Sequence, residues 1–392
     1  MLFKFTLLLI IPLKESPQPV DLVDNPVFYI PNRSQIVKTF APVKPNDMQK
    51  MKLIVLTMII SLLGYASSIS AQATNPKIMN NKNEVRMEKV SFPNTIFPKS
   101  NVTIAGDLFY PVGFDTSKKY PAVIVGHPAG GVKEQTAGLY ARKLAELGYI
   151  TLAFDASYQG ESGGEPRFLE DPAIRVEDFR AATDYLSIHS SVDPNRIGVL
   201  GICAGGGYAI NAAQTEHRLK AVATISMVDL GQLRREGLGG MLTPQLQQQM
   251  DEVAVQRTKE AKGEPVKIVS FSSGGGSDPS KTPTMYREIA DYYGTPRGYH
   301  PNEATGYVFT SLSKLFNFTA LDHVELISPR PLLLIAGSIA DSHYFSDEAY
   351  ARAKEPKELY DIPGATHVDM YDKPQDVEPA VKKLKEFFGK YL

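Results

Sequence analysis

The sequence predicts an α/β fold with a mainly parallel central sheet, flanked by helices, and a large insertion between the sixth and seventh strands. Short, continuously apolar runs such as Tyr120–Val125 and Tyr149–Phe154 are typical of strands that are buried on both faces of a parallel sheet. These runs alternate with segments of helical pattern, and that alternation favours parallel strands joined by right-handed crossovers. The alternation is interrupted at residues 227–328, where we expect a cap on the domain.

The elements follow from this pattern in chain order. Two edge strands of a β-meander come first, and buried strands separated by helices follow. The expected strands are Arg86–Phe92, Val102–Tyr110, Tyr120–Val125, Tyr149–Phe154, a strand running into Gly201, Ala221–Ser226, Pro331–Ile335 and Lys357–Ile362. The expected helices are Gln135–Leu147, Asp171–His189, one that begins after Cys203, the polar helix Pro244–Lys262 of the insertion, and Glu378–Tyr391.

A targeting segment precedes the domain. Lys50 and Lys52 form a basic region, Leu53–Leu63 an apolar region, and Ala71–Ala73 the A-x-A pattern of a cleavage site. We therefore interpret residues 51–73 as a secretory signal peptide. The alternative is a membrane anchor, although the apolar run is too short to span a bilayer comfortably.

This interpretation divides the chain into three parts. Residues 1–50 show no globular pattern and are expected to be an over-extended start or a disordered leader. Residues 74–392 form the mature domain, and cleavage would place it in the periplasm or outside the cell. We expect no stable insertion of the mature protein in a membrane.

Composition and motifs exclude several classes of function. The chain has 42 basic and 43 acidic residues, a balance that does not suggest a nucleic-acid or anionic-membrane partner. The histidines show no zinc-protease spacing, and we find neither a phosphate-binding loop nor a dinucleotide fingerprint. We therefore expect a small-molecule substrate, with no metal and no cofactor.

Cys203 is the only cysteine of the chain, so an internal disulfide is excluded. It lies in Gly201–Gly205, where a strand runs into a helix, and this is the context of a nucleophile elbow. The elbow needs small neighbours, which the glycines on both sides of Cys203 provide. The helix N-terminus favours negative charge, so we expect a lowered thiol pKa and a thiolate at rest. The alternative is a buried structural cysteine.

A second string, Gly160–Gly164, matches the G-x-S-x-G pattern of an elbow letter for letter. Its context is different, because the preceding strand ends at Phe154 and Pro166 follows where a helix should begin. We therefore interpret 155–167 as a turn-rich loop and Ser162 as a residue outside the reaction.

A cysteine nucleophile needs a base, and the base needs an orienting acid. In folds with this elbow the chain order is nucleophile, acid, histidine. Asp341 and His367 each follow a late strand and have this order, so we predict the catalytic triad Cys203, Asp341 and His367. Asp347 and Asp369 are the nearby alternatives for the acid.

An oxyanion hole needs two backbone N–H groups that point to one place. We expect one from Ala204, directly after the nucleophile, and one from Ala129 in the glycine-rich loop after Tyr120–Val125. Pro128 has no N–H to donate. We expect His127 to brace this loop. The alternative is a plain glycine-rich turn.

Five tyrosines gather in the insertion. They could line a pocket for an aromatic or sugar-bearing substrate, or pack the cap onto the main domain, which we favour. They are Tyr286, Tyr292, Tyr293, Tyr299 and Tyr307.

Over Asn101–Leu392 these features together resemble the α/β-hydrolase superfamily, and within it the dienelactone hydrolase-like branch. The specific part of the resemblance is the elbow Gly201–Tyr208 together with Asp341 and His367. The resemblance implies the α/β-hydrolase fold and a Cys-Asp-His triad that opens an activated lactone.

Two positions depart from the family pattern. Pro128 stands where the family has a glutamate that holds the resting thiol, and Tyr371 stands where it has an arginine that binds a substrate carboxylate. The large cap is a third departure. These differences argue against a dienelactone as the substrate.

The resemblance therefore implies a hydrolase that cleaves a small activated ester or lactone through an acyl-thioenzyme intermediate. One alternative is a peptidase-like or acyl-transfer member of the superfamily, although Cys203 stands where the peptidases have serine. The other is a binding protein that retains the fold without turnover.

Overall fold

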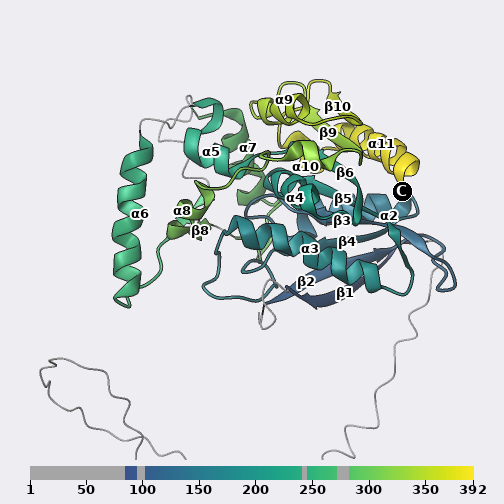
Figure 1. Cartoon of the computed structure of the whole chain (residues 1–392), viewed down its shortest axis with the longest axis horizontal. Coiled ribbons are helices and arrows are strands. Elements are labelled where there is room, and N and C mark those ends of the chain that lie inside the picture. Colours follow the sequence, from purple (N-terminus) through teal and green to yellow (C-terminus); the bar gives the residue numbers. More distant parts are fainter. Residues whose placement is uncertain (1–83, 95–101, 241–244, 272–281, 305) are drawn as a thin grey trace, which may run out of the picture. The chain divides into compact units, whose positions relative to one another are not determined.

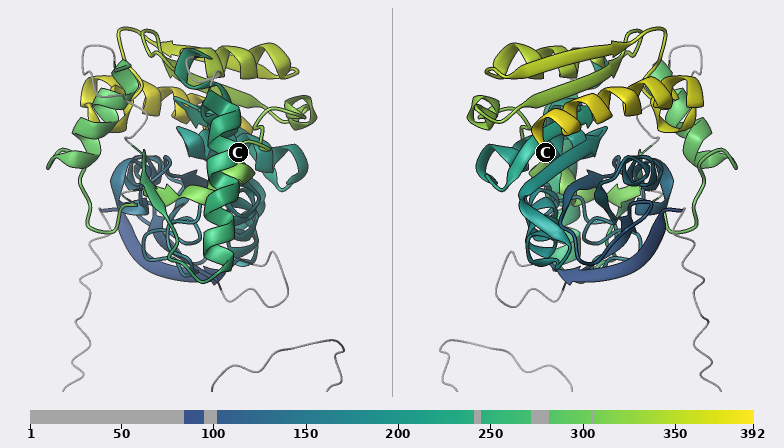
Figure 2. Two further views of the ribbon diagram at one scale, coloured as in Figure 1. Left: turned by 90° about the vertical axis from the view of Figure 1, so that its left-hand side faces the viewer. Right: turned by 90° about the vertical axis from the view of Figure 1, so that its right-hand side faces the viewer.

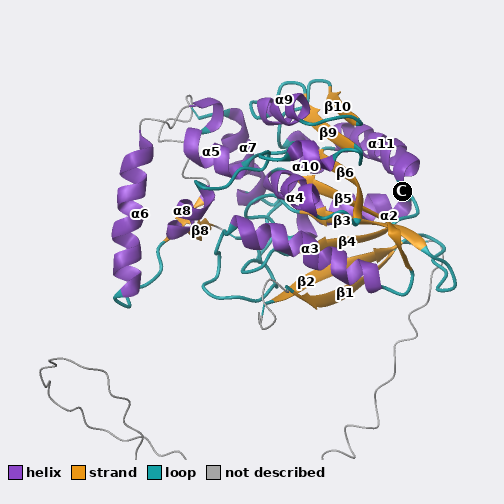
Figure 3. Ribbon diagram, in the orientation of Figure 1, coloured by secondary structure: helices purple, strands orange, loops and turns teal. Residues whose placement is uncertain are grey.

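An eight-stranded sheet runs through the computed structural model, which describes residues 84–94, 102–240, 245–271, 282–304 and 306–392 (Figures 1 and 3). The strand order is β1-β2-β4-β3-β5-β6-β9-β10. β2 pairs antiparallel with β1 and β4, and all other neighbours are parallel. The predicted mainly parallel sheet is therefore confirmed. The strands are β1 Arg86–Pro93, β2 Thr103–Tyr110, β3 Tyr120–Gly126, β4 Ile150–Phe154, β5 Val192–Ile202, β6 Leu219–Ile225, β9 Leu332–Gly337 and β10 Lys357–Ile362.

Helices cover both faces of this sheet (Figure 3). α2 and α11 pack together on one face, where a Cβ added at Gly198 would lie 2.9 Å from the ring of Phe388. α3 and α4 pack together on the other face, where a Cβ at Gly126 would lie 2.2 Å from Phe179. The helices around the sheet are α2 Gly138–Glu146, α3 Pro172–Ile188, α4 Ala204–Thr215, α9 His343–Arg352, α10 Asp369–Asp372 and α11 Pro374–Tyr391.

The insertion separates β6 from β9, which are the sixth and seventh strands of the central sheet. It contains a two-stranded antiparallel sheet and four α-helices in its described residues. The long polar α6 stands at one end of the domain, as two views show (Figures 1 and 2). The elements are α5 Leu230–Glu236, α6 Leu246–Ala261, β7 Ile268–Ser270, α7 Thr284–Gly294, β8 Gly306–Val308 and α8 Leu312–Leu315.

The first predicted helix, Gln135–Leu147, begins differently in the structure. A π-helical segment, Lys133–Ala137, precedes α2, and Gln135 has non-helical backbone angles. The side chain of Gln135 accepts a hydrogen bond from the N–H of Val132 and donates to Glu303 in the insertion. These contacts hold Gln135 outside the regular helix, and the local hydrophobic pattern does not reveal them.

The predicted leader and signal peptide lie outside the described residues, as do residues 272–281, which are rich in serine and glycine. Within the described part of the chain, none of the helices combines the length and apolar character needed to cross a membrane.

Candidate active site

Cys203 joins β5 to α4 in a strained turn. Its φ is +54° and its ψ is −123°, which is rare for a residue with a side chain. A Cβ at Gly201 would lie 2.3 Å from the carbonyl oxygen of Gly205, and a Cβ at Gly205 would lie 2.6 Å from the carbonyl oxygen of His127. The two glycines therefore allow β5, the turn at Cys203 and the glycine-rich loop that carries Ala129 to approach each other closely. We call the last of these the oxyanion loop.

The sulfur of Cys203 accepts hydrogen bonds from the N–H groups of Ala129 and Ala204 and from the hydroxyl of Tyr371. The structure thus brings both predicted oxyanion donors to the thiol. Cys203 is only 7% exposed, and this burial raises the pKa of the thiol above its ordinary value. The expected lowered pKa is therefore wrong for this structure, because burial outweighs the hydrogen bonds and the helix N-terminus.

His367 is fully buried in the loop after β10. Its Nε2 lies 3.1 Å from the hydroxyl of Tyr371, and its Nδ1 lies 2.6 Å from Oγ of Ser342. Burial lowers the pKa of His367 to about 3. At neutral pH the structure therefore has an uncharged thiol and an uncharged imidazole, connected through Tyr371.

The position of Asp341 differs from the prediction. No hydrogen bond joins Asp341 to His367 among the described residues; instead, Oδ2 of Asp341 accepts the N–H of Met285 at 3.0 Å. Met285 lies in the first turn of α7, whose free N–H groups attract a carboxylate. Asp341 thus anchors the insertion, and Ser342 takes the place beside His367 that was predicted for the acid.

The alternatives for the acid do not contact the imidazole either. The carboxylate of Asp369 accepts the N–H of Thr366 and so caps its own loop. Asp347 lies beside the imidazole of His343, 2.9 Å from its Nδ1.

His127 fixes the loop that carries Ala129 through two hydrogen bonds to backbone groups. The Nδ1 of His127 lies 2.7 Å from the carbonyl oxygen of Pro128, so Nδ1 donates, and Nε2 accepts the N–H of Ala156 at 3.0 Å. Burial and the charge of Arg175 keep the pKa of His127 well below its ordinary value. The neutral imidazole therefore braces the loop through a hydrogen bond at each of its two ring nitrogens.

The hydroxyl of Ser162 makes structural hydrogen bonds to the backbone around its loop. It is buried, its Oγ donates to the carbonyl oxygen of Asp155 at 2.7 Å, and it accepts the N–H of Ala105 at 2.9 Å. The same loop is tied down by Lys133, whose ammonium contacts the carboxylates of Asp155 and Glu161. Both hydrogen-bonding functions of the Ser162 hydroxyl are therefore occupied.

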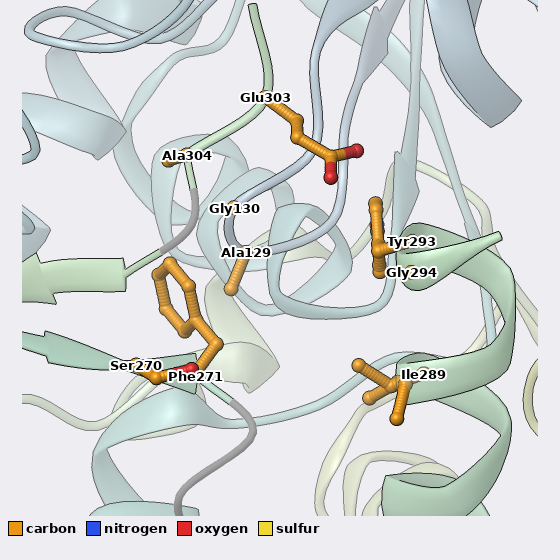
Figure 4. A pocket seen from close by; sticks show the side chains of 10 residues that line it. Ala129, Gly130, Ser270, Phe271, Ile289, Tyr293, Gly294, Glu303 and Ala304 are labelled. Atoms are coloured by element: carbon orange, nitrogen blue, oxygen red, sulfur yellow. The ribbon is translucent and has the colours of Figure 1, made fainter. Parts of the chain in front are cut away.

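A pocket of about 250 Å³ opens beside the oxyanion loop (Figure 4). Its walls combine apolar side chains with the carboxylate of Glu303, and the hydroxyl of Tyr293 is buried without a hydrogen-bond partner in the described part of the chain. Burial raises the pKa of Glu303. The lining residues are Ala129, Gly130, Ser270, Phe271, Ile289, Ala290, Tyr293, Gly294, Glu303 and Ala304.

Four of the five tyrosines divide between the two predicted roles. Tyr293 lines the pocket, whereas Tyr286, Tyr292 and Tyr307 are buried in the packing of the insertion. Tyr299 is exposed.

Sequence reasoning assigned no role to Tyr371 or Ser342, which complete the site. Tyr371 lies four residues after His367, in α10, and this spacing places both side chains on one side of a helical turn. That spacing was the available signal for Tyr371. Among the described residues, no group of three or more acidic, histidine or cysteine side chains could hold a metal ion.

Comparisons with known proteins identify the family of the chain. The model of the Dienelactone hydrolase family matches residues 109–226, which include the oxyanion loop and the Cys203 elbow. The uncharacterized protein PA2218 of Pseudomonas aeruginosa is 40% identical over 314 residues, which cover 79% of this chain and 82% of that protein. The uncharacterized protein YcjY of Escherichia coli is 40% identical over 307 residues, 78% of this chain and 99% of that protein.

Solved structures share the fold. The crystal structure of PA2218 superimposes with a TM-score of 0.73 at 39% identity, covering 79% of this chain and 94% of that chain. The α/β hydrolase GrgF of a Penicillium species, also named a polyketide transferase, gives a TM-score of 0.65 at 22% identity, covering 78% of this chain and 99% of that chain.

Proposed function

This chain belongs to the dienelactone hydrolase family of α/β hydrolases, and we propose that it is an exported enzyme that cleaves a small activated ester or lactone through Cys203. One observation carries the choice of nucleophile. The sulfur of Cys203 lies where the N–H groups of Ala129 and Ala204 converge, and Tyr371 links it to His367. An ester carbonyl placed there would meet a nucleophile, a base and two oxyanion donors together.

The first half of the reaction transfers the acyl group to sulfur. The O–H of Tyr371 turns from the sulfur toward Nε2 of His367. The thiol proton then moves to the phenol oxygen as the phenol proton moves to Nε2, and the sulfur attacks the carbonyl carbon. The carbonyl oxygen becomes an oxyanion that accepts the N–H groups of Ala129 and Ala204. The C–O bond then breaks, and the leaving alcohol takes a proton back from His367.

The second half releases the acid. Water gives a proton to Nε2 of His367 and attacks the thioester carbon, and the C–S bond breaks with return of a proton to the sulfur. For a lactone the alcohol remains attached to the acid, so a single hydroxy acid is released. The uncharged resting thiol fits an activated substrate, because a good leaving group lowers the demand on the nucleophile.

The pocket beside Ala129 sets the size of the substrate. A volume of about 250 Å³ suits a small acyl or alcohol group. Phe271 and Ile289 offer apolar contact there, and the hydroxyl of Tyr293 is available to a polar substrate atom.

The test is a panel of aryl esters, thioesters and lactones with the purified protein. We expect hydrolysis of activated substrates, loss of at least 10³-fold in Cys203→Ala, and weak residual activity in Cys203→Ser, because a hydroxyl forms its anion much less readily than a thiol. Ser162→Ala is the matched control, and its rate of hydrolysis should stay close to that of the wild type. Hydrolysis that survives Cys203→Ala but not Ser162→Ala would assign the nucleophile to the other elbow.

Acyl transfer is the second candidate, because an acyl-thioenzyme can pass its acyl group to an alcohol instead of water. GrgF, which shares the fold, is named a polyketide transferase, and this favours testing acyl transfer here. Adding an alcohol to the assay separates the two. A transferase should form the new ester in preference to the acid, whereas a hydrolase should form the acid.

Export rests on Lys50–Ala73, with its basic, apolar and A-x-A regions. We propose cleavage after Ala73. N-terminal sequencing of the protein recovered from the periplasm or the medium should give Thr74 as the first residue. A mature terminus upstream of Lys50 would contradict the proposed signal peptide.

A further inference from the structure

Arg234 has no polar partner within the described part of the chain. It lies in the last turn of α5, and its Nε is buried without a hydrogen-bond acceptor. Its neighbour Arg235 donates to the carbonyl oxygens of Phe316 and Phe318. A guanidinium offers five N–H donors, and a buried donor without an acceptor is costly. This cost is explained if a ligand supplies the acceptor.

Arg234 lies against the wall of the pocket. Its Cζ is 4.8 Å from the ring centroid of Tyr307 and 6.0 Å from that of Phe271, and the two rings are 5.1 Å apart. Phe271 lines the pocket together with Ala129, as the close view shows (Figure 4). The aromatic rings therefore hold the guanidinium beside Phe271, one of the residues that line the pocket.

The positive charge of Arg234 also acts on the site. Burial is the largest influence on the pKa of Cys203 and raises it, whereas the charge of Arg234 opposes this rise. Burial likewise raises the pKa of the Tyr286 hydroxyl, and the charge of Arg234 opposes that rise. The guanidinium is thus within electrostatic range of the thiol.

We propose that Arg234 binds a carboxylate carried by the substrate. This inference rests on the proposed function and names the class of substrate: esters or lactones with one negative charge. A planar guanidinium matches a carboxylate in shape and binds it with two parallel hydrogen bonds. A dianion such as a phosphate is disfavoured, because the carboxylate of Glu303 lines the neighbouring pocket and would repel a second negative charge.

The carboxylate can belong to the acyl group or to the leaving alcohol, and two pairs of substrates distinguish these. The acyl pair is the 4-nitrophenyl monoester of adipic acid and the same ester with a terminal carboxamide. The alcohol pair is 4-acetoxybenzoate and 4-acetoxybenzamide. Within each pair only the charge differs, so the ratio of the two kcat/KM values measures recognition of the carboxylate.

We expect Arg234→Gln to lower this ratio by roughly 10- to 100-fold in one pair, which identifies the side that carries the charge. Arg257→Gln, which removes an exposed arginine from α6, should leave the ratio unchanged. An unchanged ratio in both pairs for Arg234→Gln would overturn the proposal.

A second readout does not need turnover. Iodoacetate and iodoacetamide both alkylate thiols and differ only in the carboxylate. The ratio of their rates at Cys203 should fall several-fold in Arg234→Gln and remain at the wild-type value in Arg257→Gln. An equal ratio in wild type and Arg234→Gln would overturn the carboxylate site. If no ester is cleaved but this ratio falls, the proposed function fails while the anion site stands.

Discussion

The hydroxyl of Tyr371 lies 3.1 Å from Nε2 of His367 and also donates a hydrogen bond to the sulfur of Cys203. No direct hydrogen bond between the thiol and the imidazole is present in the described residues. A phenol can donate and accept one proton at the same oxygen, so Tyr371 can pass a proton between its two neighbours. The resting site is therefore a chain of uncharged groups.

Tyr371→Phe removes this connection and keeps the ring. We expect kcat/KM to fall by about 100-fold, the lower range for a positioned proton-transfer group. Tyr371 also lowers the pKa of Cys203, so the rise of kcat/KM with pH should move to higher pH in the variant. Both effects are measured from pH profiles of the wild type and the variant.

Tyr149→Phe is the control, since it removes a hydroxyl from a buried ring that packs on Phe388 and not on the thiol. It should leave the pH profile in place. An unshifted profile in Tyr371→Phe would mean that Tyr371 only fills space.

Much of this fold could be predicted from the sequence, because apolar runs and glycines report on backbone environment. The sheet, its antiparallel edge, the insertion and the turn at Cys203 all follow from such local signals. The contact of Ser342 with His367 could not be predicted, because it depends on which way Asp341 points. The raised pKa of Cys203 could not be predicted for a similar reason, since it depends on how completely the folded chain buries the thiol.

Ser342 and Asp341 provide a direct comparison. Ser342→Ala leaves the buried Nδ1 of His367 without its partner, and we expect at least a tenfold loss of kcat/KM together with about 1–3 kcal/mol of stability. Asp341→Asn keeps an oxygen that can accept the N–H of Met285, so kcat/KM should change by no more than a few-fold.

Steady-state kinetics and thermal unfolding of the two variants check this comparison. A loss near 10⁴-fold in Asp341→Asn, the magnitude seen for a triad acid, would show that Asp341 orients His367 during turnover.

The buried histidines should remain uncharged well below neutral pH. The pKa of His367 is about 3, so its imidazole signals in NMR should not titrate between pH 8 and pH 5. His343 is the internal control. Burial opposes its protonation, but the carboxylates of Asp361 and Asp347 raise its pKa above the ordinary value, so it should titrate.

The low pKa of His367 in the folded chain also makes the free energy of unfolding depend on pH. Above pH 6.5, His367 is neutral in the folded and the unfolded chain and contributes no pH dependence. As the pH falls from 6.5 toward 3, only the unfolded chain takes up this proton, so the contribution of His367 to the free energy of unfolding decreases. Titration of His367 near pH 6.5 in the folded protein would contradict its burial.

Alkylation of Cys203 by iodoacetamide tests the uncharged resting thiol. Because burial raises the pKa of Cys203 above the ordinary value of a thiol, the rate should increase by about tenfold per pH unit above pH 7 and should not level off near neutral pH. A rate that levels off near neutral pH would indicate a thiolate–imidazolium pair instead.

If Cys203 carries the acyl group during turnover, mass spectrometry of the quenched enzyme should detect it there. The protein is mixed with a 4-nitrophenyl ester, stopped with acid during the first turnovers and digested. We expect one added acyl group on the peptide that contains Cys203, removable by hydroxylamine and absent from Cys203→Ala. An acyl group on the Ser162 peptide, or product formation with no acylated peptide at any time, would contradict it.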